Sequence, residues 1–229
     1  MKAIFTDEQK MIANFAKAMS ESGIEDALRV YDGHSWPLQP DSSLFEEWSQ
    51  LGIKNFELGF TTGLVEAALL AYSLSQKVTP NRFTSHLEAT QVANASGLFS
   101  SVDLDVTERF CLAVEEVGVD PLGPFDAHLV GSSVFGTKQS VLHASGAYMK
   151  VVVLGDDLVA LTVGGQMSPS SSLDRLNPVF DITFDKDEII AVSPGAHKGM
   201  LRAMIILSAD LCGVARGAVE QASMYAKSR

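Results

Sequence analysis

Residues that could do chemistry are scattered through this sequence, and few of them have the spacing of a known reaction. Glu115 and Glu116 could act as paired carboxylates in acid–base chemistry, although adjacent acids at the end of a strand are more often solvated. No group of His, Cys, Asp or Glu has metal-ligand spacing. A Gly-rich phosphate loop, a G-x-S-x-G motif and a C-x-x-C motif are also absent. These patterns therefore predict no catalytic residue and no metal site.

Composition indicates a soluble globular chain. With 229 residues, 46% of them hydrophobic, the chain can bury the core of one large domain or two smaller ones. A net charge of −11 argues against nucleic acid or an anionic membrane as a partner. No apolar run approaches the ~20 residues of a membrane span, and the first residues lack an apolar signal core. We expect a cytoplasmic protein in which Cys111 and Cys212 are buried free thiols.

The first hundred residues have the pattern of helices joined by turns. Thr6 and Gln9 form a capping box ahead of an apolar stripe with helical spacing, and Gly23 is expected to end that helix. Further helices are expected over residues 24–31, 44–51, 62–78 and 82–95. We therefore predict a helical N-terminal domain over residues 1–108.

From residue 110 onward the apolar period falls to two, which is typical of strands. Strands are expected over residues 110–114, 128–134, 140–143, 149–154, 159–163, 179–184 and 189–192. Gly155-Asp156-Asp157 predicts a hairpin turn, and the Ser/Pro-rich stretch 164–174 predicts an exposed loop. The fold class is therefore α+β, with an antiparallel β-barrel or sandwich as the middle domain over residues 109–195.

The last thirty residues predict one long helix within a third segment, 196–229. Its apolar stripe, which we expect to face the core, comprises Leu201, Met204, Leu207, Leu211, Ala215, Ala218, Ala222 and Tyr225. Ala209, Gly213 and Gly217 form a ridge of small residues at four-residue steps. Because small residues let helix backbones approach closely, this spacing more often means tight packing of another helix, and the ridge is also the expected docking surface for a partner.

The order of these segments resembles the acyl-CoA dehydrogenase family, and three stretches carry the resemblance. The family pattern A…G-x-A…A…Y-A…R of the first C-terminal-domain helix is met by Ala209, Gly213-Val214-Ala215, Ala222, Tyr225-Ala226 and Arg229. The middle-domain signature G-x-K…V…A…A…VV is met by Gly136, Lys138, Val141, Ala144, Ala147 and residues 151–153. The stretch 110–121 (FCLAVEEVGVDP) occupies the place of the family's A-L-T-E-P flavin loop.

The resemblance implies a helical domain, a β domain and a four-helix C-terminal domain, of which this sequence has only the first helix. In the family, flavin adenine dinucleotide (FAD) lies between the last two domains and across a subunit interface. A glutamate of the C-terminal domain abstracts the α-proton of an acyl-CoA thioester, and the β-hydride goes to the flavin. That glutamate has no counterpart here, so we expect no catalytic residue within this chain.

The family's flavin-binding positions fall on Glu115, Glu116, Leu142 and Arg229. Glu115 and Leu142 replace hydroxyl donors, and a carboxylate cannot donate a hydrogen bond unless it is protonated. Arg229 keeps an anion-binding group, although a terminal arginine is more often solvated.

Two hypotheses follow from the resemblance. In the first, the chain is an acyl-CoA dehydrogenase-like subunit that acts on an acyl-CoA thioester, with FAD as cofactor and a second subunit that supplies the catalytic base. Relatives of this two-subunit kind act on bulky steroid side-chain thioesters. In the second, the chain is a degenerate structural partner that binds no flavin of its own.

Overall fold

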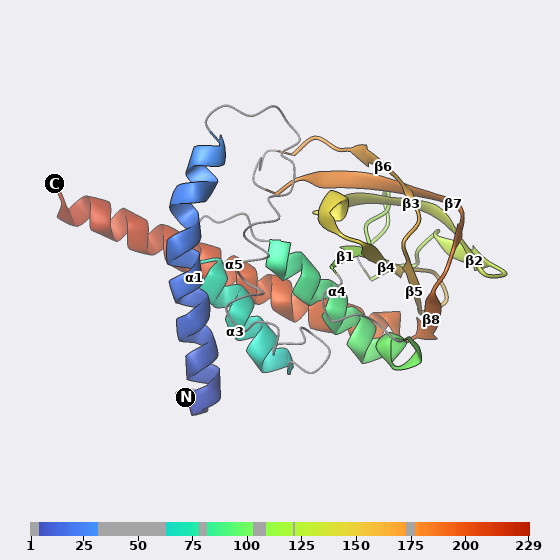
Figure 1. Ribbon diagram of the computed structural model, residues 1–229, viewed down its shortest axis with the longest axis horizontal. Coiled ribbons are helices and arrows are strands. Elements are labelled where there is room, and N and C mark those ends of the chain that lie inside the picture. Colours follow the sequence, from blue (N-terminus) through green and yellow to red (C-terminus); the bar gives the residue numbers. More distant parts are fainter. Residues whose placement is uncertain (1–4, 32–62, 78–81, 103–108, 121, 173–176) are drawn as a thin grey trace.

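The computed structural model describes residues 5–31, 63–77, 82–102, 109–120, 122–172 and 177–229. Its helices are α1 (Asp7–Tyr31), α3 (Leu64–Leu74), α4 (Arg82–Ser96) and α5 (Ala196–Lys227), with short 3-10 turns at Leu98–Ser101 and Ala144–Gly146. Its strands are β1 (Phe110–Ala113), β2 (His128–Val130), β3 (Ser133–Leu142), β4 (Met149–Val153), β5 (Leu158–Thr162), β6 (Gln166–Pro169), β7 (Val179–Glu188) and β8 (Ala191–Pro194). The predicted α+β fold with a long C-terminal helix is confirmed (Figure 1).

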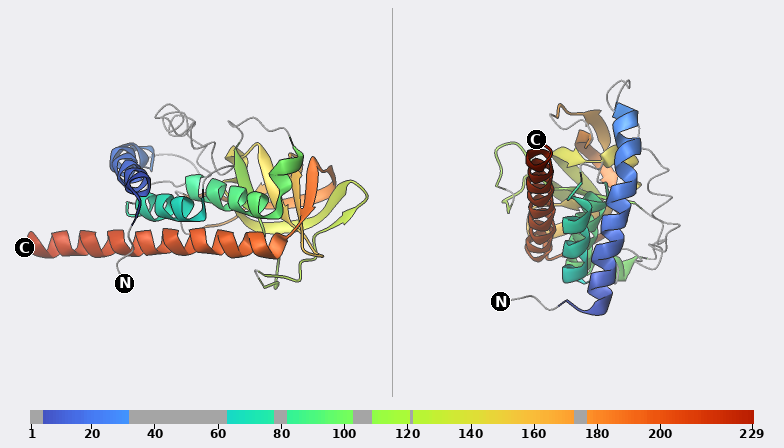
Figure 2. Two further views of the ribbon diagram at one scale, coloured as in Figure 1. Left: turned by 90° about the horizontal axis from the view of Figure 1, so that it is seen from below. Right: turned by 90° about the vertical axis from the view of Figure 1, so that its left-hand side faces the viewer.

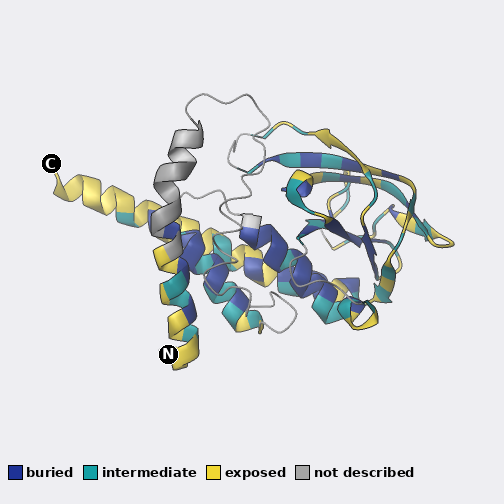
Figure 3. Ribbon diagram, in the orientation of Figure 1, coloured by how far each residue is buried: buried dark blue, intermediate teal, exposed yellow. Residues whose placement is uncertain are grey.

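The strands form two four-stranded sheets, with the orders β1-β4-β5-β8 and β2-β3-β7-β6. The first sheet lies between the second sheet and the helices. Val152 of β4 packs with the second sheet, whereas its neighbours Val151 and Val153 pack with residues of α4 and α5. Because both faces of β4 are covered, all five of its residues are buried (Figure 3). All neighbouring strands pair antiparallel except β1 and β4, which are parallel.

Helices α4 and α5 connect the β structure to the other helices. Met200 and Ala203 of α5 belong to the core beside the first sheet, and Ile206 belongs to a second core shared with α1, α3 and α4. Helix α5 therefore contributes to two cores in its first half, while its last turns extend past the other helices (Figure 2). The division into domains at residues 108 and 195 stays a prediction.

Two local signals in the sequence are confirmed. The Thr6 amide donates to Gln9 Oε1 at 3.0 Å, and the Gln9 amide donates to Thr6 Oγ1 at 3.2 Å, which is a reciprocal capping box. The hairpin between β4 and β5 turns at Asp156 and Asp157, whose φ values of 57° and 59° suit a type I′ turn.

Three local predictions are corrected or left open. The prediction that Gly23 ends a helix is wrong, because α1 continues through Gly23 to Tyr31. A glycine inside a helix costs only about 1 kcal/mol relative to alanine, which the flanking turns can outweigh. The stretch 164–174 contains the edge strand β6, which pairs with β7 through its backbone although all four of its residues are exposed. The helix expected over 44–51 lies outside the described residues.

The predicted apolar stripe of α5 faces solvent, which reverses the expected orientation of this helix. The buried residues of α5 are Ala196, Gly199, Met200, Ala203, Ile206, Gly213 and Gly217. By contrast, Leu201, Leu207 and Leu211 are 45–59% exposed. Apolar spacing alone could not choose between the two faces, because both carry apolar residues at helical steps.

The ridge of small residues docks within the chain and not on a partner. A Cβ added at Gly213 would clash with the backbone oxygen of Tyr72, and one added at Gly217 would clash with that of Gln76. Helices α3 and α5 therefore touch backbone to backbone at these glycines. The surface of α5 that is free for a partner therefore lies on the side opposite this ridge.

Candidate functional site

A buried ion pair joins the loop after β1 to strand β3. Lys138 Nζ lies 2.5 Å from Glu116 Oε1, with the lysine side chain fully buried and the glutamate side chain 5% exposed. The ammonium group also donates to the carbonyl oxygen of Val114 at 3.1 Å and lies 4.5 Å from the ring centroid of Phe125. The Lys138 side chain therefore helps to fix the loop to β3.

The carboxylate of Glu116 is occupied by these contacts. It accepts hydrogen bonds from the amides of Asp126, at 2.5 Å, and Ala127, at 3.0 Å. Burial alone would raise the pKa of this carboxyl, but the hydrogen bonds from Lys138 and the two amides outweigh burial and hold the pKa below its ordinary value. Burial lowers the pKa of Lys138, and the neighbouring Glu116 offsets part of that effect. The pair was not predicted, although Lys138 stood in the quoted G-x-K signature.

Glu115 and Leu142 lie in the same part of the β structure. The side chain of Glu115 is exposed, and its carbonyl oxygen accepts a hydrogen bond from the Gln139 amide at 2.7 Å. Leu142 ends β3 and is 36% exposed, and its carbonyl oxygen accepts a hydrogen bond from Ser85 Oγ of α4 at 3.3 Å. Glu115 and Glu116 therefore lie beside Lys138 and Gln139 of β3, whereas Leu142 lies at the end of that strand, beside the first turn of α4.

Arg229 lies far from these three residues. It follows the end of α5, and its guanidinium carbon lies 4.7 Å from the ring centroid of Tyr225. Figure 2 shows this end of α5 and the two sheets at opposite ends of the molecule. Within one chain, the structure does not bring Arg229 to the predicted flavin loop.

Comparisons with solved structures identify the fold. The chain resembles a variant of the steroid acyl-CoA dehydrogenase Tcur3481–Tcur3483, with 24% identity, a TM-score of 0.83, and coverage of 97% of this chain and 67% of that one. It also resembles the ChsE4–ChsE5 complex of Mycobacterium tuberculosis (15% identity, TM-score 0.75, 100% and 69% covered). A third neighbour is a glutaryl-CoA dehydrogenase of Mycobacterium smegmatis in complex with FADH2 (18% identity, TM-score 0.65, 98% and 67% covered).

The chain has the acyl-CoA dehydrogenase fold. No protein-family model matches the sequence, and no curated protein does. At these identities the likeness shows the fold alone, so the chemistry has to be judged from the residues.

Within one chain, the side chains predicted at the flavin loop offer FAD no hydrogen-bond donor. The flavin ring presents carbonyl oxygens, which need donors, whereas the carboxylates of Glu115 and Glu116 accept hydrogen bonds and the side chain of Leu142 has no polar group. The diphosphate needs a cation, and Arg229 lies at the far end of α5. Lys138 could supply a positive charge, but it is fully buried against Glu116. A flavin contact by these four residues stays a prediction.

A second perturbed carboxyl lies between α4 and α5. Burial, and then the negative charge of Asp210, raise the pKa of Glu88 to about 8. Asp210 Oδ1 accepts hydrogen bonds from Thr84 Oγ1, at 3.0 Å, and from Ser75 Oγ. Strongly shifted carboxyl groups are frequent at active sites. No motif in the sequence marks this cluster, because its members come from three different helices.

A cavity of about 260 Å³ lies where α5 begins beside the β4–β5 hairpin. Its lining comprises Leu122, Gly123, Pro124, Phe125, Leu154, Gly155, Asp156, Asp157, Ala196, His197 and Met200. The cavity is smaller than the ~300–1,000 Å³ of usual ligand pockets. Glu88 does not line it, so we assign Glu88 no catalytic role.

The described residues hold neither a metal-binding cluster nor a membrane-spanning helix. They contain no group of three or more His, Cys, Asp or Glu that could hold a metal ion. None of the helices in the described part of the chain is long and apolar enough to cross a membrane.

Replacing Lys138 with methionine tests the buried ion pair. K138M leaves Glu116 buried without its cation, which should lower the free energy of unfolding by about 3–5 kcal/mol in urea denaturation. The matched control is K10M, which removes a pair with Asp7 whose side chains are 58% and 97% exposed. The control should cost less than ~1 kcal/mol. Equal destabilisation by the two substitutions would contradict the structural role of Lys138.

The raised pKa of Glu88 predicts an unusual pH dependence of stability. Glu88 in the unfolded chain loses its proton near pH 4.5, whereas in the folded chain it keeps the proton up to about pH 8. The folded state therefore binds more protons in this window, and stability falls as the pH rises through it. Glu88 alone should remove on the order of 1.4 kcal/mol per pH unit.

The measurement is chemical denaturation at several pH values for the wild type, E88Q and the exposed control E8Q. E88Q should flatten the decline in stability between about pH 5 and 8, because glutamine does not titrate. E8Q should follow the wild type. Parallel curves for the wild type and E88Q would show that Glu88 does not have the raised pKa.

Proposed function

We propose that this chain is one subunit of a heteromeric acyl-CoA dehydrogenase. In this proposal the chain takes part in the flavin-dependent α,β-dehydrogenation of an acyl-CoA thioester, and a second subunit supplies the catalytic base. The observation that carries the proposal is the exposed apolar face of α5. Its members are Leu201, Met204, Ile205, Leu207, Leu211, Val214, Val219 and Tyr225.

This face has the composition and position of an assembly surface. Each of its eight side chains is 42–63% exposed, and they follow one another along a single helix. Soluble monomers rarely expose contiguous apolar patches of more than a few hundred Å², because water disfavours such surfaces. Burial of apolar area contributes about 25 cal/mol per Å², so covering this face gives a substantial driving force for association.

The names of two structural neighbours support assembly from unlike subunits. Tcur3481–Tcur3483 and the ChsE4–ChsE5 complex each carry the names of two components. The first of these neighbours is a steroid acyl-CoA dehydrogenase, which supports a bulky acyl group as the substrate in our proposal. The acidic net charge of −11 supports our expectation that neither nucleic acid nor a membrane is a partner, and we place the protein in the cytoplasm.

A second candidate function is a structural subunit that binds no flavin of its own. The contacts of Glu116 favour it, because Lys138 and two backbone amides occupy the carboxylate at a predicted flavin-binding position. The exposed carboxylate of Glu115 favours it too, since it replaces a donor with an acceptor. Flavin in the assembly is then held by the other subunit.

The test is the visible flavin absorbance of the purified chain, alone and co-expressed with candidate acyl-CoA dehydrogenase subunits of the same source. We expect colourless protein alone, and a yellow complex that oxidises an acyl-CoA only in the presence of both subunits. The double variant L207S/L211S should not co-purify with the partner. The control M11S, at a residue of α1 that is 65% exposed, should co-purify normally.

Each outcome of this experiment decides between the candidates. Yellow protein from this chain alone would contradict the structural subunit that binds no flavin. A complex that forms but stays colourless and inactive would contradict the catalytic assembly.

A further inference from the structure

Two acidic side chains lie together where α4 and α5 pack on the end of α3. The carboxylate of Asp210 on α5 accepts hydrogen bonds from Thr84 Oγ1 of α4, at 3.0 Å, and from Ser75 Oγ, just after the end of α3. Glu88 follows Thr84 by one turn of α4, and the negative charge of Asp210 acts on its carboxyl group. We call Glu88 and Asp210 the acid pair.

The two members of the acid pair are held in different ways. Two hydroxyl groups donate to Asp210, which stabilises its negative charge. Glu88 is largely buried, and no hydrogen bond within the described part of the chain offsets the cost of burying its charged form. Burial and the charge of Asp210 raise the pKa of Glu88 to about 8. At neutral pH the acid pair therefore holds one proton and one negative charge.

Other titratable side chains on α4 and on the described elements that pack against it have partners elsewhere. Glu66 of α3 accepts a hydrogen bond from Gln9 of α1 at 2.8 Å. Lys150 of β4 lies opposite Cys111 of β1 and donates to a backbone carbonyl after β5 at 3.0 Å. His86 of α4 accepts a hydrogen bond from the first amide of β1 at 3.2 Å. Asp210 remains the charged group that acts on Glu88.

The acid pair borders the apolar face of α5. Asp210 comes three residues after Leu207 and four residues before Val214, so the three side chains are neighbours on the surface of the helix. Leu207 and Val214 are 45% and 52% exposed, whereas Asp210 is half-buried. A partner that covers the two apolar side chains therefore also removes water from beside the acid pair.

We propose that assembly on the apolar face of α5 is coupled to protonation of the acid pair. Two like charges repel more strongly when water is removed from around them, so the assembled state disfavours a second negative charge on the pair. Assembly therefore favours protonated Glu88, and by linkage protonation of Glu88 favours assembly to the same extent. Coupling of this kind requires the partner subunit of the proposed function, on which the inference rests.

The coupling acts in a defined pH window. At about pH 7 Glu88 already holds its proton in the free chain, so the affinity for the partner does not depend on pH there. Above about pH 8 the free chain loses this proton, whereas the assembled chain keeps it up to a higher pH. Assembly then has to take up a proton, so the affinity falls as the pH rises, by up to about tenfold per pH unit.

The experiment is isothermal titration of the chain with the acyl-CoA dehydrogenase subunit that co-purifies with it, between about pH 6.5 and 9.5. Repeating the titration near pH 8.5 in buffers of different ionisation enthalpy counts the protons taken up. The wild type should take up a fraction of a proton and lose affinity above about pH 8. E88Q should take up fewer protons and keep a nearly constant affinity, because glutamine does not titrate.

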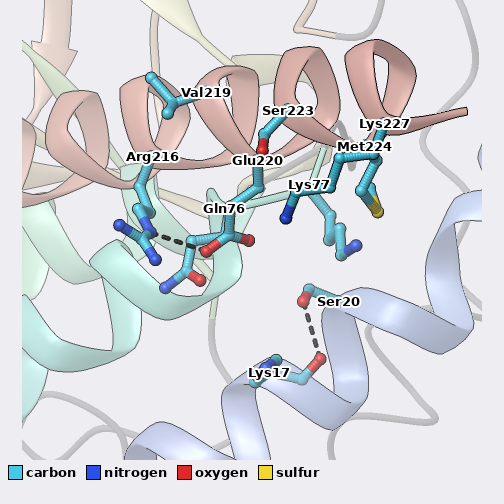
Figure 4. A pocket seen from close by; sticks show the side chains of 10 residues that line it. All are labelled: Lys17, Ser20, Gln76, Lys77, Arg216, Val219, Glu220, Ser223, Met224 and Lys227. Carbon is cyan, nitrogen blue, oxygen red and sulfur yellow. Dashed lines mark hydrogen bonds and ion pairs between the residues drawn. The ribbon is translucent and has the colours of Figure 1, made fainter. Parts of the chain in front are cut away.

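Two further variants of α5 control for other groups that titrate. E220Q removes a carboxylate that Arg216 binds at 2.7 Å, in the second half of the helix (Figure 4). C212S removes an exposed thiol next to Leu211 of the apolar face. Both variants should keep the pH dependence of the wild type.

The outcomes separate this coupling from the proposed function. A wild-type affinity that stays constant across the pH range would overturn the coupling, and so would an equal decline in E88Q. The absence of a complex at every pH would instead contradict the proposed function.

Discussion

The close packing of α5 on α3 determines which surfaces of this protein are buried and which are available. At Gly213 and Gly217 a side chain would meet the backbone oxygens of Tyr72 and Gln76, so only glycine permits the contact. Since this ridge faces inward, the opposite side of α5 must face outward. The apolar face of α5 is thus exposed as a direct consequence of two glycines. The same packing brings Gln76 and Lys77, after the end of α3, to a cavity that residues of α1 and the second half of α5 also line.

The β structure depends in a similar way on one pair of side chains. Lys138 and Glu116 connect β3 to the loop after β1, and the amides of that loop complete the coordination of the carboxylate. These contacts fix the shape of the loop. They also occupy the Lys138 ammonium group and the Glu116 carboxylate, which are then not available to a cofactor. The fold is therefore that of the acyl-CoA dehydrogenases, while the residues at the predicted flavin-binding positions of this chain serve the stability of the loop or lie exposed. A subunit that keeps the fold and relies on a partner for the chemistry is consistent with both observations.

Sequence patterns predicted the fold better than they predicted the site. Capping at Thr6 and the turn at Asp156 depend on neighbours in the chain, so they could be recognised locally and are confirmed. The orientation of α5 depends on contacts with a distant helix, and periodicity misassigned it. The Glu88–Asp210 pair and the Lys138–Glu116 pair join residues more than twenty positions apart, and their pKa shifts arise from burial that composition does not reveal.

Cys212 offers the most direct test that the apolar face of α5 is an assembly surface. It lies next to Leu211 and is exposed, so the expectation of a buried thiol is wrong for Cys212 and confirmed only for Cys111. A thiol reagent therefore reports on Cys212 alone in the folded protein. The measurement is the rate of thiol labelling of the chain by itself and after assembly with an acyl-CoA dehydrogenase partner. Rapid labelling alone and strong protection in the assembly is the result we predict. Labelling of Cys212 at the same rate in both states would contradict the proposed interface.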